Sequence, residues 1–144
     1  MRNLRADDRA EVVALAGDVD EAAKALQQVD TFVGLENGEP VAVFGCSMLA
    51  NGVGFPWFLG TDRSMAYPLA LTREARSRVA EWHKRYPVLT GWVSAANTAH
   101  ILWLRRLGFI LTDYAENYAG STVPFYQFTR VEPCVSRLRL SPSA

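Results

Sequence analysis

Apolar and polar residues follow two different periods along the chain, and these periods predict helices and strands in a mixed order. Helical spacing is present over residues 6–17, 18–28, 72–86 and 97–107. Extended apolar runs predict strands at residues 2–5, 31–36, 40–49, 52–61, 87–94, 109–118 and 123–131. The order therefore predicts an α/β fold, a mixed central sheet of about six to seven strands flanked by about four helices.

The stretch NTAHILWLRRLGF, residues 97–109, has the signals of a helix with defined ends. Asn97 is predicted to cap the free N–H groups of the first turn. Gly108 is predicted to end the helix in the left-handed conformation, which glycine adopts readily, so that Phe109 starts the next strand.

Composition and charge narrow the possible classes. The 144 residues carry no net charge, yet residues 1–62 hold four Lys/Arg against ten Asp/Glu, a net of −6, and residues 63–144 hold eleven against five, a net of +6. A general nucleic-acid binder usually has a net basic charge, so no sequence-specific nucleic-acid partner is expected. Cys46 lies in an apolar run and is expected to be a buried free thiol. No apolar run approaches membrane-spanning length, so no membrane anchor is expected.

The element order and the segment around Asn97 resemble the GNAT-type N-acetyltransferase superfamily. The matching residues are Trp92–Ser94 at a strand end, Asn97, and Leu107-Gly108-Phe109. The resemblance in element order covers roughly residues 1–131, which are taken as one GNAT-like domain, with residues 132–144 as a C-terminal extension. It implies acetyl transfer from acetyl-CoA, whose pyrophosphate the superfamily holds in a glycine-rich loop at a helix N-terminus.

The corresponding loop here, DRSMAYPLALT, departs from the superfamily pattern. With Arg63 aligned as the first residue of the motif, Ala66 and Pro68 occupy the two glycine positions, and proline has no N–H to offer. We therefore expect no cofactor, acetyl-CoA being the alternative. The weak candidates for contacting a cofactor are Arg63, Ser64, Thr72 and Asn97.

The catalytic residues that the resemblance implies are also missing. Leu104 stands where many members have a tyrosine that protonates the leaving thiolate, and leucine cannot transfer a proton. The strand at 52–61 offers no ionisable general base before Asp62. His100 and Tyr67 are weak catalytic candidates, and we expect His100 to be structural. No metal site is expected, because the two cysteines have no metal-ligand spacing.

A second resemblance, over roughly residues 55–130, is to small GNAT-like internal virion proteins of short-tailed bacteriophages. It rests on Trp57-Phe58, Thr61-Asp62, Leu71, the run from Asn97 to Ile101, Leu104, Gly108 and the closing stretch FYQFT. It implies a virion structural or assembly protein with a catalytically degenerate fold. Such a protein would locate to the virion, and to the host cytoplasm during assembly.

These resemblances leave several functions open. A structural protein would bind other virion proteins or copies of itself, partly through residues 133–144 as a docking arm. An active acetyl-CoA-dependent N-acetyltransferase with a non-standard pyrophosphate loop is the alternative, and a host-takeover factor is the third. The enzyme hypothesis is thus open, with the sequence leaning against it.

Overall fold

The computed structural model describes residues 3–16, 18–26 and 30–132. Within them the chain forms four α-helices, two 3₁₀ helices and six strands. In chain order these are α1 (Ala6–Ala16), α2 (Val19–Leu26), β1 (Asp30–Glu36), β2 (Glu39–Ala50), β3 (Val53–Gly60), η1 (Asp62–Ala66), α3 (Pro68–His83), β4 (Val88–Ser94), α4 (Thr98–Arg106), β5 (Ile110–Ala115), η2 (Tyr118–Gly120) and β6 (Phe125–Val131).

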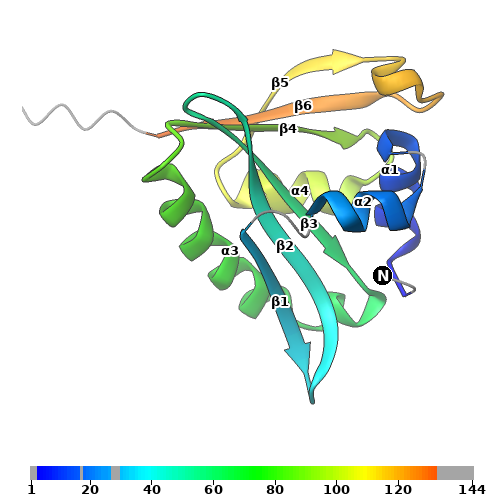
Figure 1. Cartoon of the computed structure of the whole chain (residues 1–144), viewed down its shortest axis with the longest axis vertical. Helices are drawn as coiled ribbons and strands as arrows, with labels where there is room; N and C mark the ends of the chain where they lie inside the picture. Colours follow the sequence, from blue (N-terminus) through cyan, green and yellow to red (C-terminus); the bar gives the residue numbers. More distant parts are fainter. Residues whose placement is uncertain (1–2, 17, 27–29, 133–144) are drawn as a thin grey trace, which may run out of the picture.

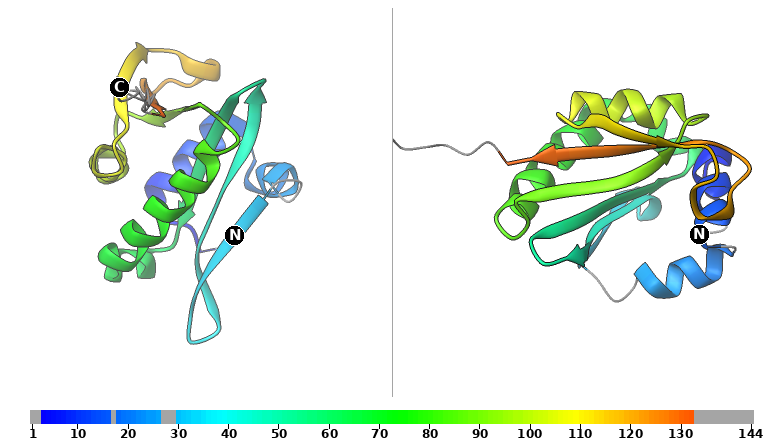
Figure 2. Two further views of the ribbon diagram at one scale, coloured as in Figure 1. Left: turned by 90° about the vertical axis from the view of Figure 1, so that its left-hand side faces the viewer. Right: turned by 90° about the horizontal axis from the view of Figure 1, so that it is seen from above.

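The six strands form one mixed sheet in the order β1-β2-β3-β4-β6-β5 (Figure 1). Every neighbouring pair is antiparallel except β3 and β4, which are parallel. Helices α3 and α4 lie on one side of the sheet and α2 lies on the other (Figure 2). The predicted α/β fold with a mixed sheet and four helices is confirmed.

The two parallel strands pair over only two residues and then diverge. Val53 pairs with Val88 and Gly54 with Leu89, and no further pair joins β3 to β4. Pro56 lies two residues beyond this pairing, where its missing N–H interrupts no ladder toward β4. The carboxyl ends of the two strands are therefore separated, and we call the gap between them the splay.

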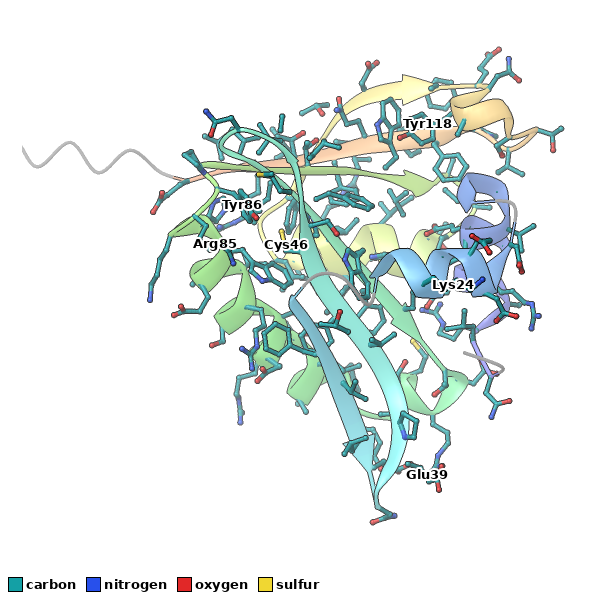
Figure 3. The ribbon with its side chains drawn as sticks, in the orientation of Figure 1. Lys24, Glu39, Cys46, Arg85, Tyr86 and Tyr118 are labelled. Carbon is teal, nitrogen blue, oxygen red and sulfur yellow. The ribbon has the colours of Figure 1, made fainter. Side chains whose placement is uncertain are left out.

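Side chains fill the space where the strands are still close. A Cβ on Gly54 would come within 2.7 Å of the Tyr86 ring and 2.8 Å of the Cys46 sulfur. Figure 3 shows Cys46 and Tyr86 near the carboxyl end of α3. The sheet can pack this tightly against α3 only because Gly54 has no side chain. Cys46 is buried, as predicted.

The main core lies between the sheet and the pair α3–α4. Its buried residues include Phe44, Val79, Leu89, Val93, Leu104 and Phe128. A smaller cluster, built around Val12 and Leu59, lies on the opposite face under α1. Tyr118 of η2, which is labelled in Figure 3, stacks on Trp92 of β4 with ring centroids 4.3 Å apart.

Several predicted boundaries are wrong or untested. The segment 3–5 forms no strand, although the Arg5 N–H donates to the Gly60 carbonyl at 2.8 Å. Helix α3 begins at Pro68, one turn before Thr72, because proline at the first helical position already has the required backbone angle. Residues 133–144 lie outside the described residues, so the division at residue 131 and the docking arm stay predictions. In the described part of the chain, no helix has the length and apolar character needed to cross a membrane.

Candidate functional site

Asp8 and Glu11 of α1 form hydrogen bonds with the diverging ends of β3 and β4. Asp8 is 1% exposed, and its Oδ2 accepts from the Gly60 N–H at the end of β3 at 2.7 Å. Its Oδ1 accepts from Nδ2 of Asn97 at 3.3 Å and forms an ion pair with Arg5 at 3.6 Å. Asp8 thus joins the end of one diverging strand to the N-cap residue of the helix that follows the other.

Glu11, one helical turn later, does the same at the end of β4. Its Oε1 accepts from the Ser94 N–H at 2.9 Å and from Nδ2 of Asn97 at 3.1 Å. Its Oε2 faces Nδ1 of His100 at 4.0 Å. Burial raises the pKa of Glu11 from 4.5 to about 7, against the lowering effect of its hydrogen bonds. Glu11 is therefore a buried carboxyl that changes charge near neutral pH.

His100 lies in the first turn of α4, next to the aromatic rings of Phe58 and Trp103. Burial lowers its pKa from 6.5 to about 4, and the nearby Arg5 cation adds to this shift. Its Nδ1 makes no hydrogen bond with any described residue. The ring is accordingly neutral at pH 7, and its one buried ring nitrogen without a hydrogen bond is the atom turned toward Glu11.

A cavity of about 240 Å³ opens beside His100 between η1, the start of α3, and α4. Phe58, Leu71 and Trp103 form much of its apolar wall. Its charged lining residues are Arg5 and Arg106, and no acidic side chain from the described part of the chain contributes to its lining. We call it the His100 cavity. An apolar chain carrying a negative charge suits this lining best.

Helices α3 and α4 are joined by hydrogen bonds near the His100 cavity. The Trp103 indole N–H donates to Oγ1 of Thr72 at 3.1 Å, and Arg76 donates to the carbonyl of Arg106 at 3.4 Å. These two hydrogen bonds join the first half of α3 to α4, and Figure 2 shows that the axes of the two helices cross. Their N-terminal ends, which carry partial positive charge, both lie at the His100 cavity.

The loop that the sequence analysis compared with the pyrophosphate cradle is folded into η1 and committed to internal contacts. Arg63 forms an ion pair with Glu36, and the Tyr67 hydroxyl donates to the same carboxylate. This hydrogen bond raises the pKa of Tyr67. Pro68 is the first residue of α3, so the helix offers one N–H fewer at its start. These internal contacts and the missing N–H leave the loop poorly suited to holding a diphosphate.

The structure separates the residues that the sequence analysis singled out. His100 and Asn97 meet at the splay, where the Oδ1 of Asn97 accepts from the His100 N–H at 3.3 Å, as expected of a helix cap. Tyr67 lines a different groove, between β1 and α3. Thr72 donates to the Pro68 carbonyl at 2.6 Å. Roles for these residues in binding a cofactor stay predictions.

The remaining candidates are internal. The Ser64 hydroxyl is buried and donates to the Thr61 carbonyl at 2.7 Å. Leu104 is buried in the main core. Among the described residues, no three His, Cys, Asp or Glu side chains gather closely enough to hold a metal ion.

Sequence reasoning missed Asp8, Glu11 and Arg5. The acids of α1 suggested only favourable charge at a helix N-terminus. Their real partners are 52 and 83 residues away along the chain, in Gly60 and Ser94. The one available signal was the spacing of Asp8 and Glu11, which places both on the same face of a helix.

Removing one member of the Glu11–His100 pair should expose the titration of the other in the pH dependence of stability. In Glu11→Gln, the unfolded chain binds the His100 proton more tightly than the folded chain does. The free energy of unfolding should therefore rise by up to about 3 kcal/mol from pH 4 to pH 6.5. In His100→Gln, the folded chain binds the Glu11 proton more tightly, so stability should fall by a similar amount from pH 4.5 to pH 7.

Urea unfolding of both variants across this range measures the two trends. In the unsubstituted protein the trends oppose each other, so its stability should depend less on pH than that of either variant. Two variants with trends of the same sign would contradict the assignment of one neutral imidazole and one raised carboxyl pKa.

The chain resembles solved structures in fold alone. No protein-family model and no curated protein matches it. The ribosomal-protein-S5-alanine acetyltransferase from Vibrio fischeri matches with a TM-score of 0.68 at 10% identity, covering 89% of this chain and 84% of that one. An acetyltransferase from Bacillus subtilis in complex with CoA matches with a TM-score of 0.67 at 8% identity, covering 90% and 96%.

A GNAT family acetyltransferase from Elizabethkingia anophelis with acetyl-CoA bound matches with a TM-score of 0.65 at 11% identity, covering 84% of this chain and 88% of that one. The GNAT fold that the sequence predicted is thereby confirmed. Nothing in these comparisons links the chain to bacteriophage virion proteins.

Proposed function

We propose that this protein, which has the GNAT fold, is an N-acetyltransferase that takes its acetyl group from a pantetheine thioester such as acetyl-CoA. The observation that carries the proposal is the Glu11–His100 pair beside the His100 cavity. A general base works best when its pKa lies near the operating pH, and the pKa of Glu11 is about 7.

The pair divides the proton transfer between two groups. His100 lines the cavity with the same ring whose Nδ1 faces Glu11. An attacking amine can give its proton to Nε2 while Nδ1–H passes to Oε2 of Glu11, so no stable imidazolium forms. This agrees with a His100 pKa of about 4 and places the proton on the stronger base. The 4.0 Å separation would shorten in the reacting complex, as catalytic hydrogen bonds commonly do.

When bound, the thioester supplies the activated carbonyl carbon that the amine attacks. The C–N bond forms as the C–S bond breaks, and the reaction balances when the stored proton returns to the departing sulfur. The apolar wall of Phe58, Leu71 and Trp103 would hold the arm and exclude water from the carbonyl. An adjoining void of about 40 Å³ leaves room for a short acyl group.

Thiol release tests this function. The protein is incubated with acetyl-CoA or with acetyl-pantetheine, together with polyamines or peptides that have free amino groups. Free thiol is followed by a colour reagent and the acetylated amine by mass spectrometry. Amine-dependent thiol release supports the proposal, and its absence with both donors at millimolar concentration would contradict it.

A second candidate function is the non-enzymatic role in a bacteriophage virion that the sequence resemblance implied. The observation that favours it is the commitment of Arg63 and Tyr67 to Glu36, together with Pro68 at the start of α3. Under this alternative the Glu11–His100 pair only fastens α1 to the splay. The thiol-release experiment separates the two functions.

A further inference from the structure

A band of unpaired positive charge lies along the outer surface of α3 and α4, next to the His100 cavity. Its members, which we call the arginine rim, are Arg73, Arg76, Arg105 and Arg106. All four are exposed, and none forms an ion pair with any described residue. An unpaired cluster of one sign creates a local field that attracts an acidic partner.

The helix contacts fix the rim beside the cavity. On α3, Leu69, Arg73 and Arg76 share one face by their spacing of four and seven residues. On α4, Leu102 and Arg106 share a face in the same way. The hydrogen bonds that join Thr72 to Trp103 and Arg76 to Arg106 bring these two faces together.

Exposed apolar side chains accompany the arginine rim on its helix faces or line the cavity. Leu69 is 82% exposed, and Leu102 and Met65 are each more than half exposed. Met65 and Leu102 also line the cavity itself. An apolar centre surrounded by charged residues is the composition of a protein–protein interface. A nucleotide would use few of these aliphatic contacts.

The diphosphate of CoA also finds poor support at the start of α3. The carboxylate of Glu36 holds both Arg63 and Tyr67 there, and it adds negative charge near the helix end. A single phosphate can instead form an ion pair with Arg106, because this residue belongs both to the arginine rim and to the lining of the cavity. The cavity thus fits a thioester arm that ends in one phosphodiester and emerges into a basic, partly apolar surface.

We infer that the acyl donor is a carrier protein with an acidic surface, whose phosphopantetheine arm enters the His100 cavity while its body docks on the arginine rim. This inference rests on the proposed acyltransferase function and names its donor. The rim supplies the charge complementarity, the exposed aliphatic residues supply the centre of the contact, and Arg106 meets the phosphodiester of the arm. Electrostatic attraction of this kind mainly raises the rate of productive encounter.

The test compares three donors with one amine acceptor: an acetylated bacterial acyl carrier protein with its phosphopantetheine arm, acetyl-CoA, and acetyl-pantetheine. The carrier protein should give the highest kcat/KM. Arg73→Glu should lower kcat/KM about tenfold with the carrier protein and leave it unchanged with acetyl-pantetheine, which does not reach the rim. Arg9→Glu, with the same charge change on an exposed residue of α1, should leave all three rates unchanged.

Three other results of this comparison would contradict the carrier-protein proposal. If acetyl-CoA is used as well as the carrier protein or better, the carrier proposal is wrong and the acyltransferase function stands. An equal loss with all three donors in Arg73→Glu would also overturn the docking role of the rim. If none of the three donors releases thiol, the acyltransferase function fails and the carrier proposal fails with it.

Discussion

Glu11→Gln should lower kcat for amine acetylation by at least about a hundredfold without unfolding the protein. Glutamine has nearly the shape of glutamate, and its amide oxygen can still accept from the Ser94 N–H. It cannot take up the proton that arrives through His100. Thiol-release assays measure the loss of turnover, and circular dichroism of the same samples measures whether the fold is retained.

The pH profile separates a catalytic role of Glu11 from a structural one. In the unsubstituted protein, kcat/KM should rise with pH as Glu11 loses its proton, with an apparent pKa of about 7. The Glu11→Gln variant should lack this rise. Glu21→Gln, the same chemical change at an exposed position on α2, serves as the matched control. A Glu11→Gln enzyme with full turnover and an unchanged profile would remove Glu11 from the mechanism.

Asp8→Ala should lower the free energy of unfolding by about 3–5 kcal/mol. The substitution leaves the buried N–H of Gly60 without its acceptor and leaves Arg5 without its closest buried partner. An unsatisfied buried donor and an unpaired cation are among the most destabilising results of a single substitution. Urea unfolding monitored by tryptophan fluorescence measures the change.

Two further variants identify the cause of that loss. Asp8→Asn keeps an oxygen acceptor for Gly60, and burial already raises the pKa of Asp8 and disfavours its charge, so the loss should be clearly smaller. Asp7→Ala removes the exposed neighbouring carboxylate and should change stability little. An Asp8→Ala protein as stable as Asp7→Ala would mean that the splay does not depend on this residue.

Local features of the fold could be predicted from the sequence, because their causes lie within a few residues. Asn97 caps α4 and Gly108 ends it with a φ of +87°, as the spacing of polar and apolar residues indicated. The predicted start of α3 was wrong because Tyr67, which precedes the helix, is not a usual capping residue, whereas Thr72 is. Proline at the first helical position, as at Pro68, is the better signal for a helix start.

The chemistry of the site could not be predicted in the same way. Glu11 looks like any acid in an exposed helix until the fold places it beside Ser94 and His100. Arg63 and Tyr67 looked available for a ligand because their partner, Glu36, comes from a strand about thirty residues earlier. In each case the decisive neighbour is distant in sequence, and burial rather than residue type sets the pKa.

The hydrogen bonds of α1 to the ends of β3 and β4 also bear on the order in which the chain folds. The helix precedes both strands in the chain, yet its hydrogen-bond acceptors have no donors until Gly60 and then Ser94 are in place. Contacts that span 52 and 83 residues form late, because a long loop must close before they contribute. We therefore expect α1, which is synthesised early, to dock late, with Asp8 and Glu11 as hydrated carboxylates until then. The raised pKa that suits Glu11 to proton transfer is therefore a property that the carboxyl gains only when folding buries it.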